Sequence, residues 1–381
     1  MIGLAFVVAS WIMLALNLFR ALPSADVALV LGTIAIAESV ALLLASHRKK
    51  KTLQQELEIS LARWTSLVLF ILLAGWYGEL PFFQDQPLAL LCFLGLSLCI
   101  SLLRLIQTQM QSASALWCSS PVRIWVCAMI CPAISLGAEP NQTVVLFAAV
   151  LVALVLLGLA LVGGGSTPAK VAGGKSTSEV SSSLMSQMDL LILPILLNPT
   201  LTWPYLIARG VGTLPQLVLS LLHITAELRL VEEREEGGIV RLAATAGRIN
   251  LGSLLIGGAS FLMVLAIVPL VAQHFHLPET DFKSIALWIT FAHFAPAFLG
   301  ATVILLRTAG MRRELLCIQI SCSVLFCCTL LFGSETSGLE IAKTLAATSW
   351  LASFLGAALL AKRYGIWPGI TAVLFRQIRL F

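Results

Sequence analysis

Residues 143–163 read TVVLFAAVLVALVLLGLALVG, an apolar run without a single charged side chain. About twenty residues of α-helix are enough to cross the hydrocarbon core of a bilayer. The run is continuously apolar and does not alternate between polar and apolar residues, which excludes a strand of a closed membrane barrel. It therefore predicts a transmembrane helix, and it identifies the solvent of the fold as lipid.

Similar runs occur on both sides of this one. The chain is 59% hydrophobic and 11% charged, whereas soluble domains are about a quarter charged. The predicted fold class is an all-α integral membrane protein with about 12 transmembrane helices. The predicted spans are 3–19, 27–45, 62–77, 87–106, 121–137, 143–163, 184–198, 202–226, 250–273, 284–306, 315–333 and 340–361.

Lysine and arginine are concentrated in every second loop between these spans, for example at 48–51, 229–248 and 307–313. The remaining loops are short and mildly acidic. By the positive-inside rule, this alternation predicts that both termini are cytoplasmic. The net charge of +5 follows from this topology and gives no indication of a nucleic-acid partner.

Residues 164–183, GGSTPAKVAGGKSTSEVSSS, are rich in Gly, Ser and Thr and predict a flexible cytoplasmic linker. The linker separates an N-terminal six-helix half (1–163) from a C-terminal six-helix half (184–363). Its GGKST segment is not a phosphate-binding loop, because Ala169 occupies the position of the required first glycine and no strand precedes it. The tail, 364–381, is expected either to lie on the cytoplasmic leaflet as an amphipathic helix or to be a frayed end.

The eighth span carries polar residues at helical spacing, which places them along one face. One interpretation is a helix that lines a cavity. The other is that the charged ends extend to opposite interfaces and that the uncharged members form helix–helix hydrogen bonds. Pro204 and Pro215 are expected to kink this span. The polar residues are Arg209, Thr213, Gln216, Ser220, His223 and Glu227.

Other ionisable residues lie within or beside spans, where charges are costly and usually meet a partner or water. Glu38 is expected either to pair with a cation or take up a proton, or to form an interhelical bond. Asp189 is either a cavity residue or interfacial. For a lone His293, packing is favoured over a proton relay. Three arginines extend to the interfaces or attract anionic lipid headgroups: Arg20, Arg104 and Arg123.

Cysteine and histidine do not form a metal site in this sequence. The nine cysteines lie in or beside apolar spans and are interpreted as packing residues. His274 and His276 are expected to belong to an ordinary polar loop. Without a metal-protease motif, a serine elbow or a long outer loop for catalytic residues, the chain is predicted to be no enzyme and to need no cofactor or metal.

The segment 186–215, SQMDLLILPILLNPTLTWPYLIARGVGTLP, resembles the start of the second half of polysaccharide flippases of the multidrug/oligosaccharidyl-lipid/polysaccharide superfamily. The family pattern falls on Asp189, Tyr205 and Ala208, with Arg209 close to a frequent arginine. The segment LNLFRALPSADVALVLGTIAIAES, 16–39, is similar to the family's first helix pair through Arg20 and Leu22. Three positions that usually hold glycine differ: Pro23, Val27 and Trp203.

This resemblance implies a MATE-like, V-shaped transporter in the bacterial inner membrane. It implies a flippase for a polyprenyl-pyrophosphate-linked oligosaccharide in cell-surface polysaccharide biosynthesis, with membrane lipids and a polymerase complex as the expected partners. Cations must compensate a buried pyrophosphate. The candidate cavity residues are Arg209, Gln216, Thr213, Tyr205, Arg20, Arg104 and Arg123, and the candidates for coupling to protons or cations are Glu38, Asp189 and His223.

Three other functions remain open at this stage. A cation-coupled drug or metabolite exporter of the same superfamily would need a cavity that is acidic or aromatic rather than cationic. A membrane enzyme acting on lipid-linked sugars, such as a polymerase or acyltransferase, would need an outer-facing cluster of Arg, His and Asp. A non-transporting membrane subunit of a biosynthetic complex is the third. The glycan, the coupling ion and the oligomeric state do not follow from the sequence.

Overall fold

The computed structural model of the chain is built from α-helices. It describes residues 22, 24–44, 60–66, 68–69, 87–109, 142–163, 185, 187–333 and 337–365, and no strand occurs among these residues. The chain divides into two compact units, Met1–Trp203 and Pro204–Phe381. The predicted spans 3–19 and 121–137, residues 70–77 of the span 62–77, the linker 164–183 and residues 366–381 of the tail lie outside the described residues.

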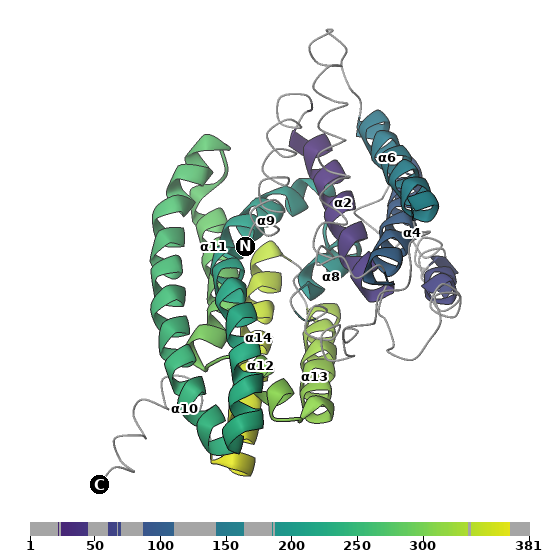
Figure 1. The fold of residues 1–381 in the computed structure, drawn as a ribbon. Helices are drawn as coiled ribbons and strands as arrows, with labels where there is room; N and C mark the ends of the chain where they lie inside the picture. Colours follow the sequence, from purple (N-terminus) through teal and green to yellow (C-terminus); the bar gives the residue numbers. More distant parts are fainter. Residues whose placement is uncertain are drawn as a thin grey trace. The chain divides into compact units, whose positions relative to one another are not determined.

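In the first unit, three long helices pack against one another (Figure 1): α2 (Ser24–Leu44), α4 (Pro87–Gln109) and α6 (Gln142–Gly163). Their core consists of fully buried aliphatic side chains such as Ile34, Leu96 and Ile100. A helical stretch at 60–66 joins this group through Trp64, whose indole Nε1–H donates to the carbonyl of Leu94 at 3.2 Å. The short helix α8 (Met188–Leu196) contacts α2.

Helix α9 (Pro199–Gly212) follows α8 after a break at Leu197, whose backbone is extended. Asn198 begins α9 as its N-cap: its side-chain oxygen accepts the N–H of Leu201 at 3.0 Å. A proline at the first helical position costs nothing, because that N–H has no partner in a helix. The Asn-Pro pair thus explains why the two predicted spans are separated here.

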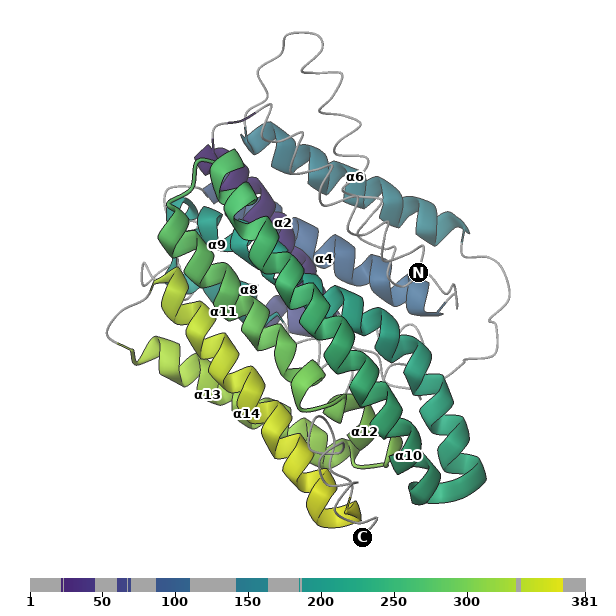
Figure 2. The same cartoon turned by 90° about the vertical axis from the view of Figure 1, so that its left-hand side faces the viewer.

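The second unit is dominated by α10 (Leu214–His274), which consists of two helical arms that meet at Gly238. Figure 2 shows α10 bent back on itself. Gly238 has φ 64° and ψ −153°, a conformation essentially restricted to glycine. The charged segment 227–249, which hydropathy predicts as a loop between spans, is therefore helical on both sides of a one-residue turn.

The described residues of the second unit form four further helices: α11 (Glu279–Phe298), α12 (Thr302–Thr308), α13 (Arg312–Leu331) and α14 (Gly338–Tyr364). Helix α11 packs against α10 and α14, and α13 packs against α14. The predicted span 284–306 is thus divided into α11 and α12 by a turn at Gly300, whose φ is 87°. The predicted spans 315–333 and 340–361 correspond to α13 and α14.

Four stretches of the described part are long and apolar enough to cross a membrane: Thr245–His274, Thr280–Thr308, Arg312–Leu331 and Gly338–Tyr364. Large apolar side chains on their surfaces, such as Leu255, Leu262 and Leu270, are about two-thirds exposed. Such a surface is unfavourable in water and suits lipid. The all-α, multi-pass membrane class is confirmed, whereas the count of twelve spans and the division into 1–163, 164–183, 184–363 and 364–381 remain predictions.

Candidate functional site

The polar face predicted for the eighth span is divided between two helices. Arg209 lies in the last turn of α9, and Gln216 and His223 lie on the first arm of α10. Thr213 separates the helices; its N–H donates to Arg209 O at 2.9 Å and its hydroxyl to Gly210 O at 3.1 Å. Pro215 explains the break, because it has no N–H for the carbonyl four residues earlier.

The hairpin of α10 gives the depth of this break. His223 Nε2 lies 3.2 Å from Ser253 Oγ, and Gly238 is midway between these residues along the chain. Counting equal numbers of residues from Gly238 along both arms places Thr213 about level with Met263. Since the apolar stretch of the second arm runs from Thr245 to His274, the break lies near the middle of the membrane-spanning stretch.

Arg209, Thr213 and Gln216 are all half-buried. They place a guanidinium, a hydroxyl and an amide within about two helical turns, where the surrounding sequence is apolar. Polar groups at this depth usually face a partner or water. The geometry is therefore that of a helix interrupted at Thr213 and Pro215, where the backbone stays close to helical, with polar side chains beside the interruption.

His223 makes the interhelical hydrogen bond that one of the two interpretations of this span predicted. Ser253 is fully buried between the arms, and its hydroxyl meets the half-buried imidazole. Hydrogen bonds of this kind contribute about 0.6 kcal/mol on average in membrane proteins. This contact does not test the predicted role of His223 in coupling transport to protons or cations, which remains a prediction.

Tyr205, in α9, is fully buried and packs against the start of α14. A Cβ atom added to Gly338 would lie 3.4 Å from Cδ2 of Tyr205 and 3.3 Å from Cδ1 of Ile285. The tyrosine ring therefore lies close against the backbone at the glycine. This contact joins α9, α11 and α14 and sets the position of Arg209, which follows one helical turn later.

The other predicted site residues belong to the first unit. Asp189 is fully buried in the first turn of α8, and Glu38 is half-buried in α2; both belong to the first unit. Arg104 lies in α4, but its side chain is outside the described residues, as are Arg20 and Arg123 altogether. Their roles remain predictions.

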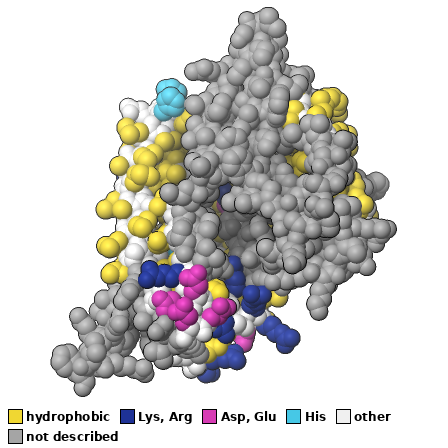
Figure 3. Space-filling model, in the orientation of Figure 1, with side chains coloured by type: hydrophobic (Ala, Val, Ile, Leu, Met, Phe, Trp, Pro, Cys, Tyr) yellow, Lys and Arg dark blue, Asp and Glu magenta, His cyan; other side chains and the backbone are white. Residues whose placement is uncertain are grey.

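Acidic and basic side chains gather at one end of the second unit, below a largely hydrophobic surface, and a histidine lies at the opposite end of the same face (Figure 3). The exposed charged residues include Glu232, Glu235 and Glu236 of the α10 hairpin, Arg312 and Arg313 of α13, and Lys362 and Arg363 of α14. Arg363 forms an ion pair with Glu314 at 2.7 Å. The distribution matches a helical unit whose charged end lies outside the bilayer.

Sequence reasoning missed three side chains that fasten this end of the unit. Asn250 is buried and its side-chain oxygen accepts the N–H of Ala301 at 3.2 Å. Arg234 donates to Thr308 O, and Tyr364 Oη donates to Ala309 O at 3.2 Å. Asn250 had a signal, as an amide directly before an apolar run. No sequence signal distinguished Arg234 and Tyr364, because Arg and Tyr are common near the ends of membrane spans without any specific contact.

Comparisons with known proteins give fold likeness at low identity. No family model matches the chain, and no curated protein matches it. Solved structures similar to it include a mutant of a MATE protein (11% identity, TM-score 0.44, 95% of this chain and 93% of that chain). A eukaryotic MATE transporter, AtDTX14, follows with 13% identity, TM-score 0.40 and 94% of each chain. An outward-facing multidrug resistance MATE transporter of the MOP superfamily has 12% identity, TM-score 0.39 and 95% of each chain. At these TM-scores, family and function must be argued from the chain's own residues.

Proposed function

We propose that the chain is a flippase of the bacterial inner membrane, which moves a polyprenyl-pyrophosphate-linked oligosaccharide from the cytoplasmic to the outer leaflet. The termini would be cytoplasmic, and a polysaccharide polymerase complex would take up the product. The proposal rests on the multi-pass helical fold, the sequence resemblance at 186–215, and the polar group at the α9–α10 break.

The observation that carries the proposal is the half-buried Arg209 beside a helix break near the middle of the membrane-spanning stretch. Transporters commonly place substrate sites at discontinuous helices near the bilayer midplane. A guanidinium presents a planar fork of donors that matches phosphate oxygens bidentately. Arg209 would hold the pyrophosphate and Gln216 would donate to sugar or phosphate oxygens, while the Thr213 hydroxyl, whose proton is given to Gly210 O, would accept from a sugar hydroxyl.

The lipid tail would remain in the bilayer while the charged group passes along the protein. Binding must be reversible, and half-buried residues suit this, because a ligand there remains partly hydrated. Covalent chemistry is unnecessary, since only the position of the substrate changes.

The test replaces Arg209 in cells that depend on this gene for surface polysaccharide. Arg209→Ala is expected to stop polymer export and to leave lipid-linked oligosaccharide in the cytoplasmic leaflet. Arg209→Lys, which keeps the charge and loses the fork, is expected to reduce export about 10- to 100-fold. Arg229→Ala, at an exposed position of α10, is the control. Full export by Arg209→Ala at wild-type membrane levels would overturn the assigned role.

A second candidate, an exporter of amphipathic cations from the same superfamily, is favoured by an aromatic group on α11 and α14. The rings of Phe291 and Trp350 stack with centroids 4.6 Å apart, and Trp288 and Phe298 meet them at 5.9 and 5.5 Å. Trp288 and Phe291 are more than one-third exposed. Aromatic faces attract organic cations, so Phe291→Ala would sensitise cells to such compounds under this function and leave export of polysaccharide unchanged.

A further inference from the structure

The short helix α12 ends in a complete Schellman motif. Met311 N–H donates to Leu306 O at 2.8 Å, and Gly310 N–H donates to Arg307 O at 3.1 Å. Gly310 has φ 83°, as the left-handed position of this motif requires. Met311 and Leu306 are both buried in one apolar cluster, which is the hydrophobic contact that usually accompanies the motif.

A Schellman motif satisfies two of the last carbonyls of a helix and leaves those nearest the end without a backbone donor. In α12 these are the carbonyls of Thr308 and Ala309. Each receives a side-chain donor from a different helix: Arg234 of the first α10 arm bonds Thr308 O, and Tyr364 of α14 bonds Ala309 O. Gly310 lies close to the guanidinium of Arg234, since a Cβ added to Gly310 would be 3.5 Å from Nη2 of Arg234.

The other end of α12 is also held from outside. Gly300 turns the chain after α11, and Asn250 of the second α10 arm accepts the N–H of Ala301. A seven-residue helix cannot sustain itself in isolation. Its position therefore depends on its neighbours, and three polar contacts from both α10 arms and α14 meet within its few turns.

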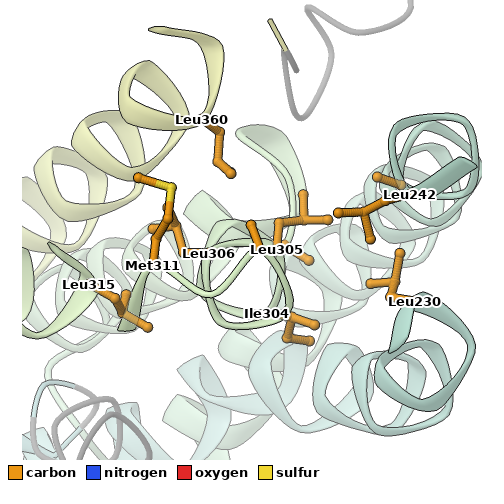
Figure 4. Packing of buried hydrophobic residues seen from close by; sticks show 11 residues of the cluster. Leu230, Leu242, Ile304, Leu305, Leu306, Met311, Leu315 and Leu360 are labelled. Atoms are coloured by element: carbon orange, nitrogen blue, oxygen red, sulfur yellow. The ribbon is translucent and has the colours of Figure 1, made fainter. Parts of the chain in front are cut away.

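The apolar contacts of α12 lie on both of its sides, as Figure 4 shows. Leu230 and Leu242, one from each α10 arm, lie toward Ile304 and Leu305, while Leu360 lies near Leu306 and Met311. This cluster is close to the hairpin turn and to the charged end of the unit. The two side chains that donate to the end of α12 are more accessible to solvent than this buried cluster. Arg234 is exposed and Tyr364 is half-buried.

We propose that the Arg234–Thr308 and Tyr364–Ala309 contacts, which we term the α12 clasp, are a releasable fastening. They hold the α12–α13 turn in the conformation described here and break when the second unit changes shape during transport. Polar contacts at an exposed edge suit this task, because water replaces their partners when they open, whereas the apolar cluster resists separation. The role in transport rests on the proposed function; the local opening does not.

Hydrogen–deuterium exchange of the full chain in lipid nanodiscs tests the opening directly. The amides of Ala309, Gly310 and Met311 are all hydrogen-bonded at the turn, so their exchange reports its opening. Arg234→Ala is expected to accelerate exchange there about tenfold or more, since it removes a charged donor. Arg234→Lys should restore at least part of the protection. The amide of Phe332, bonded to Cys328 at the other end of α13, should be unchanged.

Tyr364→Phe removes only the hydroxyl and serves as the second variant, in case Arg234→Ala misfolds. Its effect should combine non-additively with that of Arg234→Ala, because both act on one turn. Arg229→Ala, exposed on the same α10 arm, is the matched control. Unchanged exchange at 309–311 in both clasp variants would overturn the clasp and leave the flippase untouched.

Polysaccharide export by the same variants tests the role in transport. Arg234→Ala is expected to lower export several-fold at wild-type protein level, and Arg234→Lys to recover it. Faster exchange with unchanged export in Arg234→Ala would overturn the role of the clasp in transport. By contrast, full export by Arg209→Ala would count against the flippase assignment alone, because exchange at 309–311 is measured without substrate.

Discussion

The guanidinium of Arg234 donates to the carbonyl of Thr308, 74 positions further along the chain. This contact joins the first arm of α10 to the last turn of α12. The same turn receives Tyr364 from α14, so a single helix end connects three elements. Because three elements meet at this helix end, the packing and hydrogen bonds of the neighbouring glycines and polar residues are expected to be sensitive to substitution.

Gly238→Ala is expected to destabilise the second unit by about 1–3 kcal/mol, because its φ of 64° and ψ of −153° are strained for any residue with a Cβ. Thermal unfolding of the purified protein in one detergent measures the change. Gly247→Ala is the control, since nothing lies within 4 Å of a Cβ there and φ is helical. Equal melting temperatures for both variants would contradict the strained turn.

Gly257→Ala and Gly258→Ala form an adjacent pair with opposite expectations. A Cβ at Gly257 would lie 2.6 Å from Cβ of Ala297, whereas a Cβ at Gly258 meets nothing within 4 Å. Overpacking of α10 against α11 should cost Gly257→Ala about 1–3 kcal/mol, and Gly258→Ala should be neutral or slightly stabilising. Thermal unfolding of both variants ranks them, and a reversed order would disprove the close approach.

Ser253→Ala is expected to cost about 0.5–1 kcal/mol by removing the partner of His223. Ser260→Ala, on the same arm and bonded only to Ile256 O of its own helix, is the comparison. His223→Ala removes the same hydrogen bond together with the volume of the imidazole, so it should cost more than Ser253→Ala, and the double variant should show coupling. Loss of transport in His223→Ala, with transport intact in Ser253→Ala, would assign His223 to coupling as well.

Asn250→Ala is expected to cost about 1–3 kcal/mol, because it leaves the buried N–H of Ala301 without its acceptor. Exchange of the Ala301 amide should accelerate in this variant, and thermal stability should fall. Asn250→Asp keeps an acceptor oxygen, so it should retain more of the Ala301 protection than the alanine variant. Equal protection in the wild type and Asn250→Ala would rule out this contact.

Hydropathy predicted the long membrane helices well, because burial in lipid depends on composition over about twenty residues. The span 315–333 corresponds to α13 and the span 340–361 to α14. The α10 hairpin was predicted as a loop because its segment is rich in charged residues. Its charges remove it from a hydropathy window, yet Glu, Arg, Leu and Ala are strong helix formers, and only Gly238 interrupts the helix.

The turn between α11 and α12 and the fastenings around it were not predictable in this way. Residues 297–301 are apolar or glycine, so their hydropathy is the same in a straight helix and in a turn. The positive φ of Gly300 and Gly310 becomes favourable only once α10 and α14 supply partners for the exposed backbone groups. Arg209 could be singled out from the sequence, because it lies inside the predicted span even when the ends of the span are shifted by a few residues, and a lone cation there is unusual.

The turn at Gly238 also has a practical consequence. The apolar stretch of the second α10 arm begins at Thr245, so the tip stands about 10 Å beyond it, at 1.5 Å per helical residue. Arg234 is exposed on this projection. Under the proposed topology, in which this tip is cytoplasmic, trypsin added to the cytoplasmic side of sealed vesicles is expected to cut the chain near the tip, and trypsin added to the opposite side is not. A single glycine conformation thus supplies a natural proteolytic marker of membrane orientation.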